Sequence, residues 1–164
     1  MINKINFLFV TLFGIGKIKK VPGSLASLAT ILVLFFFFNI LHISTNIILF
    51  FIVTLFFISL YSIKIFIKNL KDKDPKEVVI DEFIGQSIPI CLYEVAHPSV
   101  KDNYEVLKFY FIMFFLFRIF DILKPYPVSY YDKNFKNSFG IVMDDVCAGL
   151  YVVAIMVLYM VLSS

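Results

Sequence analysis

The chain has 164 residues, enough for one domain, and we expect residues 1–164 to form a single membrane domain. Hydrophobic residues make up 60% of the chain, whereas an ordinary soluble domain has roughly 45–50%, so the composition indicates a membrane protein. The net charge is only +3 and the lysines gather in short stretches, which favours a phospholipid bilayer as partner and argues against nucleic acid. Cys91 and Cys147 lie in apolar stretches without the spacing of a zinc site or a disulfide framework.

The N-terminal 20 residues contain a short apolar stretch with no small-x-small cleavage site after it. We therefore expect a retained segment at the membrane interface rather than a signal peptide. Residues 14–27 follow as GIGKIKKVPGSLAS, with Ser24 as the expected cap of the next helix. Backbone N–H groups at a helix start bind anions, so Gly23 and Ser24 are candidate phosphate-binding residues. The stretch fits no P-loop pattern, and lysines flanking a membrane span would also explain it.

Five apolar segments follow in chain order, at residues 24–41, 46–63, 83–96, 106–123 and 141–162. The first would span roughly 27 Å as a helix, close to the thickness of a hydrocarbon core. The turn HIST predicts a helical hairpin from the first two segments. The third is short and contains Pro89, so it is a half-span, a kinked helix or a buried segment. We therefore predict an all-α fold, a polytopic membrane helix bundle with about four to five hydrophobic segments.

Lysine positions predict the orientation of these segments. Lysines lie before the first segment, after the second, and between the fourth and fifth, whereas the loop before the fourth has only Lys101. The lysines of the rich stretches are Lys17, Lys19, Lys20, Lys64, Lys68, Lys71, Lys73, Lys76, Lys133 and Lys136. By the positive-inside rule these stretches are cytoplasmic, so the N-terminus is inside.

Three charged clusters fall at this same cytoplasmic level. They are Asp81 and Glu82, then Arg118, Asp121 and Lys124, then Asp144 and Asp145. A charge at the bilayer centre costs roughly 2.5–3.5 kcal/mol, so several at one depth must neutralise one another or bind a ligand. Small residues, namely Gly85, Ala148 and Gly149, follow the acidic pairs and would let neighbouring helices approach closely.

Each cluster alone has a simpler explanation. Carboxylates are favoured at helix N-termini, Arg and Lys anchor helices at the interface, and Asp121 would pair with Arg118. Together, however, the clusters present five carboxylates, one guanidinium and one ammonium. Mg²⁺ prefers oxygen ligands, and Arg and Lys suit a phosphoryl group. The set therefore predicts phosphate-ester chemistry at the membrane surface.

The stretches VPGSLAS, IDEFIGQ, FRIFDILKPYP and FGIVMDDVCAG, in this order, resemble the phosphatidylglycerophosphatase A family. The resemblance covers nearly the whole chain. It implies a Mg²⁺-dependent lipid phosphatase that hydrolyses phosphatidylglycerol phosphate to phosphatidylglycerol in phospholipid biosynthesis. It also implies a multi-pass protein of the bacterial cytoplasmic (inner) membrane, with its active site facing the cytoplasm and no obligate protein partner evident. The family's loop is usually P-G-T-x-G-S, and Ala26 here replaces its second glycine.

On this resemblance the candidate catalytic residues are Asp81, Glu82, Asp121, Lys124, Asp144 and Asp145. We expect Asp144 and Asp145 to hold Mg²⁺, with Asp81 or Glu82 as further ligands. Arg118 and Lys124, with Gly23 and Ser24, would bind the substrate phosphate. The nucleophile is either metal-bound water or a carboxylate, with Asp121 the candidate for the latter.

Two alternatives come from other functional classes. A small membrane ion or proton transporter would also use intramembrane acidic residues, although these charges gather at one interface rather than along a path. A phosphotransferase acting on a CDP-activated lipid would carry a D-G-x-x-A-R pattern, which is absent here.

Overall fold

The computed structural model describes residues 4–68, 70, 72–97 and 102–163, and within these ranges every regular element is helical. The helices are α1 (Lys4–Val10), η1 (Ile15–Lys17), α2 (Pro22–Phe35), η2 (Phe36–Ile40), α3 (Thr45–Ile67), α4 (Ile80–Ala96), α5 (Asn103–Leu123), α6 (Val128–Asn134) and α7 (Ser138–Ser163). The prediction of an all-α fold is confirmed. Lys71 and Lys101, two of the lysines used for orientation, lie outside the described residues.

Three helices are long and apolar enough to cross a membrane, namely Pro22–Ile40, Thr45–Ile67 and Ser138–Leu162. They correspond to the first, second and fifth predicted segments, and the first runs through α2 into the π-helical η2. The third and fourth segments also form helices, α4 and α5, but these are not among the three candidate spans. A count of four to five spans therefore stays a prediction.

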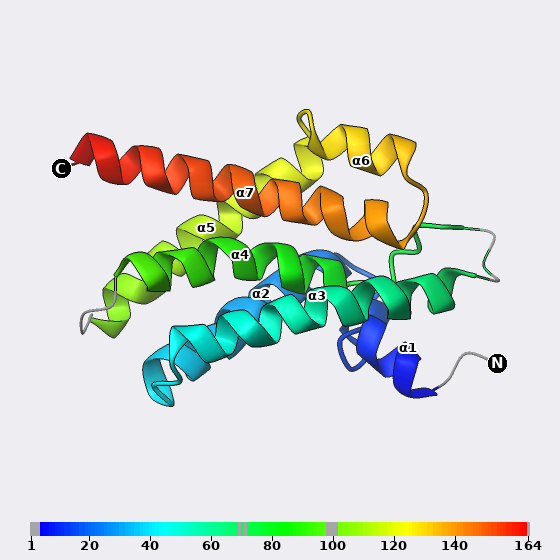
Figure 1. The fold of residues 1–164 in the computed structure, drawn as a ribbon, viewed down its shortest axis with the longest axis horizontal. Coiled ribbons are helices and arrows are strands. Elements are labelled where there is room, and N and C mark those ends of the chain that lie inside the picture. Colours follow the sequence, from blue (N-terminus) through cyan, green and yellow to red (C-terminus); the bar gives the residue numbers. More distant parts are fainter. Residues whose placement is uncertain (1–3, 69, 71, 98–101, 164) are drawn as a thin grey trace.

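The third segment is a buried helix at the centre of the bundle. α4 runs for 17 residues through Pro89, and most of its side chains are buried. It packs against α7, α2, α3 and α5, and in Figure 1 it lies between α7 and α3. Of the alternatives offered by the sequence, the buried segment describes α4, because its neighbours shield it on several faces.

Glycines allow α4 and α7 to cross closely. A Cβ added at Gly85 would lie 2.6 Å from the backbone oxygen of Asp145, and one at Gly149 would overlap the carbonyl oxygen of Gly85. The missing side chains therefore set how near these two helices come, as expected for small residues at a helix crossing. This crossing places the start of α7 beside the first turns of α4.

The start of α2 differs from the expectation for Ser24. The helix begins at Pro22, and its N-cap is Val21, with no side-chain hydrogen bond to the cap. The prediction of Ser24 as cap is wrong because Pro22 starts the helix two residues earlier, where the fixed φ of proline suits the first helical position. Ser24 instead lies within the first turn.

Two short helices complete the polar end. α1 packs against α3, where the Asn6 side chain donates a hydrogen bond to the backbone oxygen of Ser62 at 3.1 Å; its position at a membrane interface stays a prediction. α6 was not predicted from the sequence, and it packs against α7.

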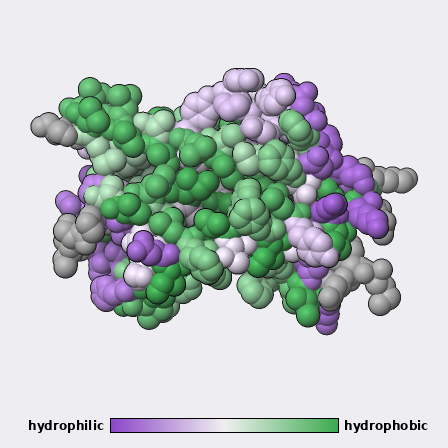
Figure 2. Space-filling view, in the orientation of Figure 1, coloured by the Kyte–Doolittle hydropathy of each residue, from purple (hydrophilic) through white to green (hydrophobic). Residues whose placement is uncertain are grey.

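The helices alternate in direction, so the starts of α2, α4 and α7 and the ends of α3 and α5 come to the same end of the bundle (Figure 1). Figure 2 shows hydrophobic residues across the middle of one face and hydrophilic residues gathered toward its two ends. This distribution fits a membrane-embedded bundle. The alternating helix directions bring the three charged clusters to one end of it.

Candidate active site

A cavity of about 450 Å³ lies where the starts of α2, α4 and α7 meet the end of α5. We call it the polar cavity. It is lined by Val21, Pro22, Gly23, Ser24, Asp74, Pro75, Lys76, Val78, Asp81, Glu82, Arg118, Asp121, Ile122, Lys124, Asp144 and Asp145. All nine site residues predicted from the sequence are among them. The tertiary structure thus brings the three clusters and the Gly23–Ser24 pair together, while their individual roles stay predictions.

The floor of the polar cavity is a group of three carboxylates. One oxygen each from Asp81, Glu82 and Asp145 lie within 4.8 Å of one another. The side chains of Asp81 and Asp145 are only 8% and 2% exposed. Each of the three has a buried carboxylate oxygen without a hydrogen-bond partner among the described residues. Three carboxylates at this spacing repel one another, and unpaired buried oxygens are costly, so the group fits a bound cation.

The net charge of the lining supports the same conclusion. Six carboxylates and three basic side chains line the polar cavity, which leaves a formal charge of −3. A phosphate monoester is itself an anion, so these residues alone would repel it. The donors available at the floor are carboxylate oxygens, which suit a hard divalent cation such as Mg²⁺. The residues present therefore fit such an ion.

The first turn of α2 closes one side of the carboxylate group. A Cβ at Gly23 would overlap Oε1 of Glu82 and lie 3.3 Å from Nη1 of Arg118. Only a residue without a side chain leaves both groups in place. Gly23 thus has a steric role that the sequence did not reveal, beside its predicted contact with phosphate.

The basic side chains come from the end of α5. Arg118 Nη1 lies 2.9 Å from Asp121 Oδ2, which confirms the predicted pairing. α5 ends at Leu123, before Pro125, and Lys124 takes a left-handed backbone conformation at the C-cap. This turn directs Lys124 away from the Arg118–Asp121 pair and toward α6 and α7.

Lys124 joins two acidic residues. Its Nζ donates hydrogen bonds to Asp132 Oδ1 at 2.7 Å and to Asp144 Oδ2 at 2.9 Å. Burial opposes the charge on Lys124, but these two carboxylates outweigh it and raise the pKa of Lys124. Burial likewise opposes the charge on Asp132, yet the Lys124 ammonium holds the pKa of Asp132 below its usual range. Both groups are therefore charged at neutral pH.

The adjacent residues Asp144 and Asp145 have different surroundings. Asp145 joins the carboxylate group on the floor. Asp144 accepts hydrogen bonds at both oxygens, from Lys124 at Oδ2 and from the Asp145 backbone N–H at Oδ1. Successive residues of a helix point about 100° apart, which lets one neighbour face α4 while the other faces Lys124.

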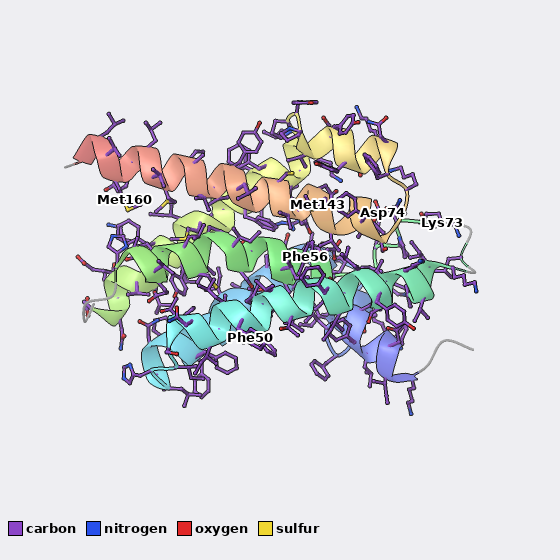
Figure 3. The ribbon with its side chains drawn as sticks, viewed as in Figure 1. Phe50, Phe56, Lys73, Asp74, Met143 and Met160 are labelled. Atoms are coloured by element: carbon purple, nitrogen blue, oxygen red, sulfur yellow. The ribbon has the colours of Figure 1, made fainter. Side chains whose placement is uncertain are left out.

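Sequence reasoning missed several residues of this region. Asp74 and Lys76 line the polar cavity, and Asp74 lies beside the first turns of α7 in Figure 3. Lys76 had been used only as a marker of orientation, although its closeness to Asp81 in the chain was a usable signal. No sequence pattern identified Asp132.

Gln86 was quoted in the sequence only as part of a motif. It follows Glu82 by four residues, is fully buried, and has no partner for either side-chain polar atom within the described part of the chain. A buried amide of this kind requires a partner such as water or a bound group.

The chain as a whole is similar to known proteins. The family model for phosphatidylglycerophosphatase A matches residues 8–160. A phosphatidylglycerophosphatase A of Haemophilus influenzae is 33% identical over 155 residues, covering 94% of this chain and 88% of the relative. One of Escherichia coli is 29% identical over 138 residues, covering 84% and 73%. A putative phosphatidylinositol-3-phosphatase of Bacteroides thetaiotaomicron is 43% identical over 79 residues, covering 48% and 45%. No solved structure matches the chain.

Proposed function

The chain belongs to the phosphatidylglycerophosphatase A family and is a phosphatase, and on that premise we propose that it hydrolyses phosphatidylglycerol phosphate to phosphatidylglycerol and phosphate with the help of Mg²⁺. The observation that carries the proposal is the group formed by Asp81, Glu82 and Asp145, whose buried oxygens lack partners in the described structure. The relatives reported above are all named as phosphatases, and the transporter alternative has no comparable support.

Asp81, Glu82 and Asp145 would hold the ion. Asp144, predicted together with Asp145 as a principal ligand of Mg²⁺, has both oxygens engaged by other groups, so we assign it instead to positioning Lys124. When bound, Mg²⁺ would neutralise negative charge on the phosphoryl group during transfer. Each Mg²⁺ would also offset two of the three excess negative charges of the cavity lining.

Arg118 and Lys124 would bind the substrate phosphate. Both line the polar cavity, and each is held by a carboxylate that fixes its position. Charge-assisted hydrogen bonds from these cations would strengthen as negative charge accumulates on the transferring group. Gly23 would keep the α2 turn close to Glu82 and Arg118, and Ser24 would offer a hydroxyl at the same wall.

Two nucleophiles remain compatible with these residues. Water attack needs a group to orient the water, and the cavity offers several carboxylates for that purpose. Direct attack by Asp121 would form a phosphoryl-aspartate that water then hydrolyses. Rapid quenching of the enzyme with ³²P-labelled substrate distinguishes the two, because only the second route leaves label on the protein.

We further propose that the protein is a multi-pass protein of the bacterial inner membrane with the polar cavity facing the cytoplasm. The support is the position of the cavity at the same end of the bundle as Lys73, Lys76 and Lys136. Cysteine labelling in intact cells at Lys136→Cys tests this, since a cytoplasmic position predicts no reaction with a membrane-impermeant maleimide.

The decisive experiment is an assay of the purified protein on phosphatidylglycerol phosphate, phosphatidic acid and phosphatidylinositol 3-phosphate. We expect the first to be the preferred substrate, with turnover stopped by EDTA and restored by Mg²⁺. Glu105→Gln, an exposed residue at the start of α5, serves as control for Asp81→Asn. Full activity in EDTA would contradict the metal assignment, and no phosphate release from any of the three lipids would contradict the proposed function.

A further inference from the structure

The wall of the polar cavity is polar on one side and apolar on another. Asp74 and Lys76, from the segment before α4, contribute exposed charged side chains. Val21 and Ile122 line the same cavity and are 66% and 69% exposed. Apolar side chains are stabilised by leaving water, so these two favour an apolar contact at the mouth of the charged cavity.

Val21 is the N-cap of α2 and Ile122 lies in the last turn of α5, and these two helix ends approach each other at Gly23 and Arg118. A Cβ at Gly23 would be 3.3 Å from Arg118 Nη1, so the start of α2 lies against the end of α5. Ile122 follows Arg118 by four residues and therefore shares its helix face. Val21 precedes Gly23 by two residues. Both side chains thus extend these walls beyond the carboxylate group, toward the mouth of the cavity.

The backbone at Val21 is unusual for its residue type. Val21 has φ 47° and ψ 51°, the left-handed region, which is a genuine outlier for a β-branched residue. Such conformations cost on the order of 1–3 kcal/mol and persist where the surrounding structure imposes them. Glycine or asparagine would adopt the same backbone with less strain. A valine held here, largely exposed, is not explained by packing in the core.

We propose that Val21 and Ile122 form an apolar lip over which a membrane phospholipid enters the polar cavity sideways from the bilayer. The proposal rests on the proposed function. The phosphate monoester of the lipid lies in the polar cavity, and its glycerol backbone and first acyl carbons cross between α2 and α5 at the lip. The candidate span Pro22–Ile40 begins at this point, so the acyl chains continue along apolar helix surface.

The lip makes a specific kinetic prediction. Its side chains contact a part of the lipid that does not react, so they contribute equally to binding of substrate and transition state. Loss of such contacts raises KM and leaves kcat unchanged. The deacylated head group, glycerophosphoglycerol phosphate, has no acyl carbons and gains nothing from the lip. Its affinity is therefore independent of Val21 and Ile122.

The test compares Val21→Asn and Ile122→Ser with Leu123→Ser. Leu123 is 72% exposed and adjacent to Ile122 but does not line the cavity, so it is a matched control. For dioleoyl phosphatidylglycerol phosphate in mixed micelles, we expect the KM of each lip variant to rise about 10-fold with kcat unchanged. The inhibition constant of glycerophosphoglycerol phosphate should stay within about twofold of wild type, and Ile122→Leu should retain the wild-type KM.

Three results would overturn the lip while leaving the proposed function intact. They are an unchanged lipid KM in both lip variants, an equal rise in Leu123→Ser, and a parallel loss of affinity for the deacylated head group. A wild-type protein without activity on the lipid would instead contradict the proposed function. An unchanged inhibition constant also shows that the variants fold and keep the phosphate site.

Discussion

The first turn of α4 separates two cavities of similar size and opposite character. The polar cavity, of about 450 Å³, receives Asp81 and Glu82 from this turn. An apolar cavity of about 350 Å³ receives Ile80 and Phe83. The rest of its lining comes from α1, the turn after it, η1, α2, η2 and α3, as Phe9, Leu12, Phe13, Ile15, Ala29, Val33, Leu34, Phe37, Phe51, Ile52 and Leu55. Residues 80–83 thus line both cavities. Ile80 and Phe83 are three residues apart and share a helix face, whereas Asp81 and Glu82 between them point to the other cavity.

The two cavities differ in what they lack. The polar cavity has buried oxygens without partners among the described residues, whereas the apolar one is an open hollow lined by hydrophobic side chains, of which Phe13 is 86% exposed. An unpaired buried charge favours a ligand strongly, while an open apolar hollow offers only hydrophobic and dispersion contacts. Substitutions in the polar cavity should therefore change function, and substitutions in the apolar cavity should change stability. The predictions below test this contrast.

The largest effect is expected for Asp145→Asn. The change keeps the shape of the side chain but removes one of the three charges on the cavity floor. We expect kcat to fall roughly 100-fold or more. Mg²⁺ should also lose its ability to raise the Tm of the purified protein, because the ion stabilises only the folded state that binds it. Wild-type activity together with a retained Mg²⁺-dependent rise in Tm would rule out a ligand role for Asp145.

A smaller but still large effect is expected for Gly23→Ala. The added methyl group would overlap the Glu82 carboxylate, which must turn away from the cavity floor. We expect kcat/KM to fall between about 10-fold and 100-fold, measured on the lipid substrate. Ala26→Gly, on the same helix but outside the lining of the polar cavity, is the control. Unchanged activity in Gly23→Ala would mean that Glu82 has room to move without consequence.

Asp132→Asn should have a moderate effect. Lys124 donates a 2.7 Å hydrogen bond to the Asp132 carboxylate, and the change replaces this charged acceptor with a neutral amide. Asp144 then remains as the carboxylate that holds Lys124. We expect about a 10-fold loss of kcat with a smaller change in KM. Asp132→Glu should restore part of the activity, since it retains the charge. Equal losses in the Asn and Glu variants would indicate a structural role for α6 instead.

The smallest effect on activity is expected in the apolar cavity. Ala29→Val adds apolar volume to its wall and should leave kcat/KM within about twofold of wild type. The hollow is open and Ala29 is half-buried, so the larger side chain has room and the Tm should stay level or rise slightly. Thermal unfolding in detergent measures this. A strong loss of activity without loss of Tm would show that the two cavities are coupled.

The sequence predicted those parts of the fold and site whose signal is local. Runs of apolar residues identified the helices at Pro22–Ile40, Thr45–Ile67 and Ser138–Leu162, because a bilayer requires continuous apolar surface on a hydrogen-bonded helix. The charged residues were identifiable because charge among apolar neighbours is costly. α5 ends at Leu123, shortly before Pro125, since proline disfavours a helical residue before it.

Other features depended on contacts between distant segments. The Lys124–Asp132 pair joins α5 to α6, and nothing in the intervening sequence marks Asp132 as its partner. The start of α2 was mislocated because both Pro22 and Ser24 suit helix starts, and only the chain path decides between them. Val21, the N-cap of α2, has a left-handed backbone conformation, which β-branched residues disfavour.

The sequence by itself determined which residues carry charge within an apolar chain and where the five long apolar helices lie. Only the tertiary structure decided which of those charged residues lie together. It put Asp145 with Asp81 and Glu82, put Asp144 with Lys124, and left Val21 and Ile122 at the mouth. The physical reason is that residue type and helix period are local properties. The partner that each helix face meets depends instead on how closely helices cross, here at Gly23, Gly85 and Gly149.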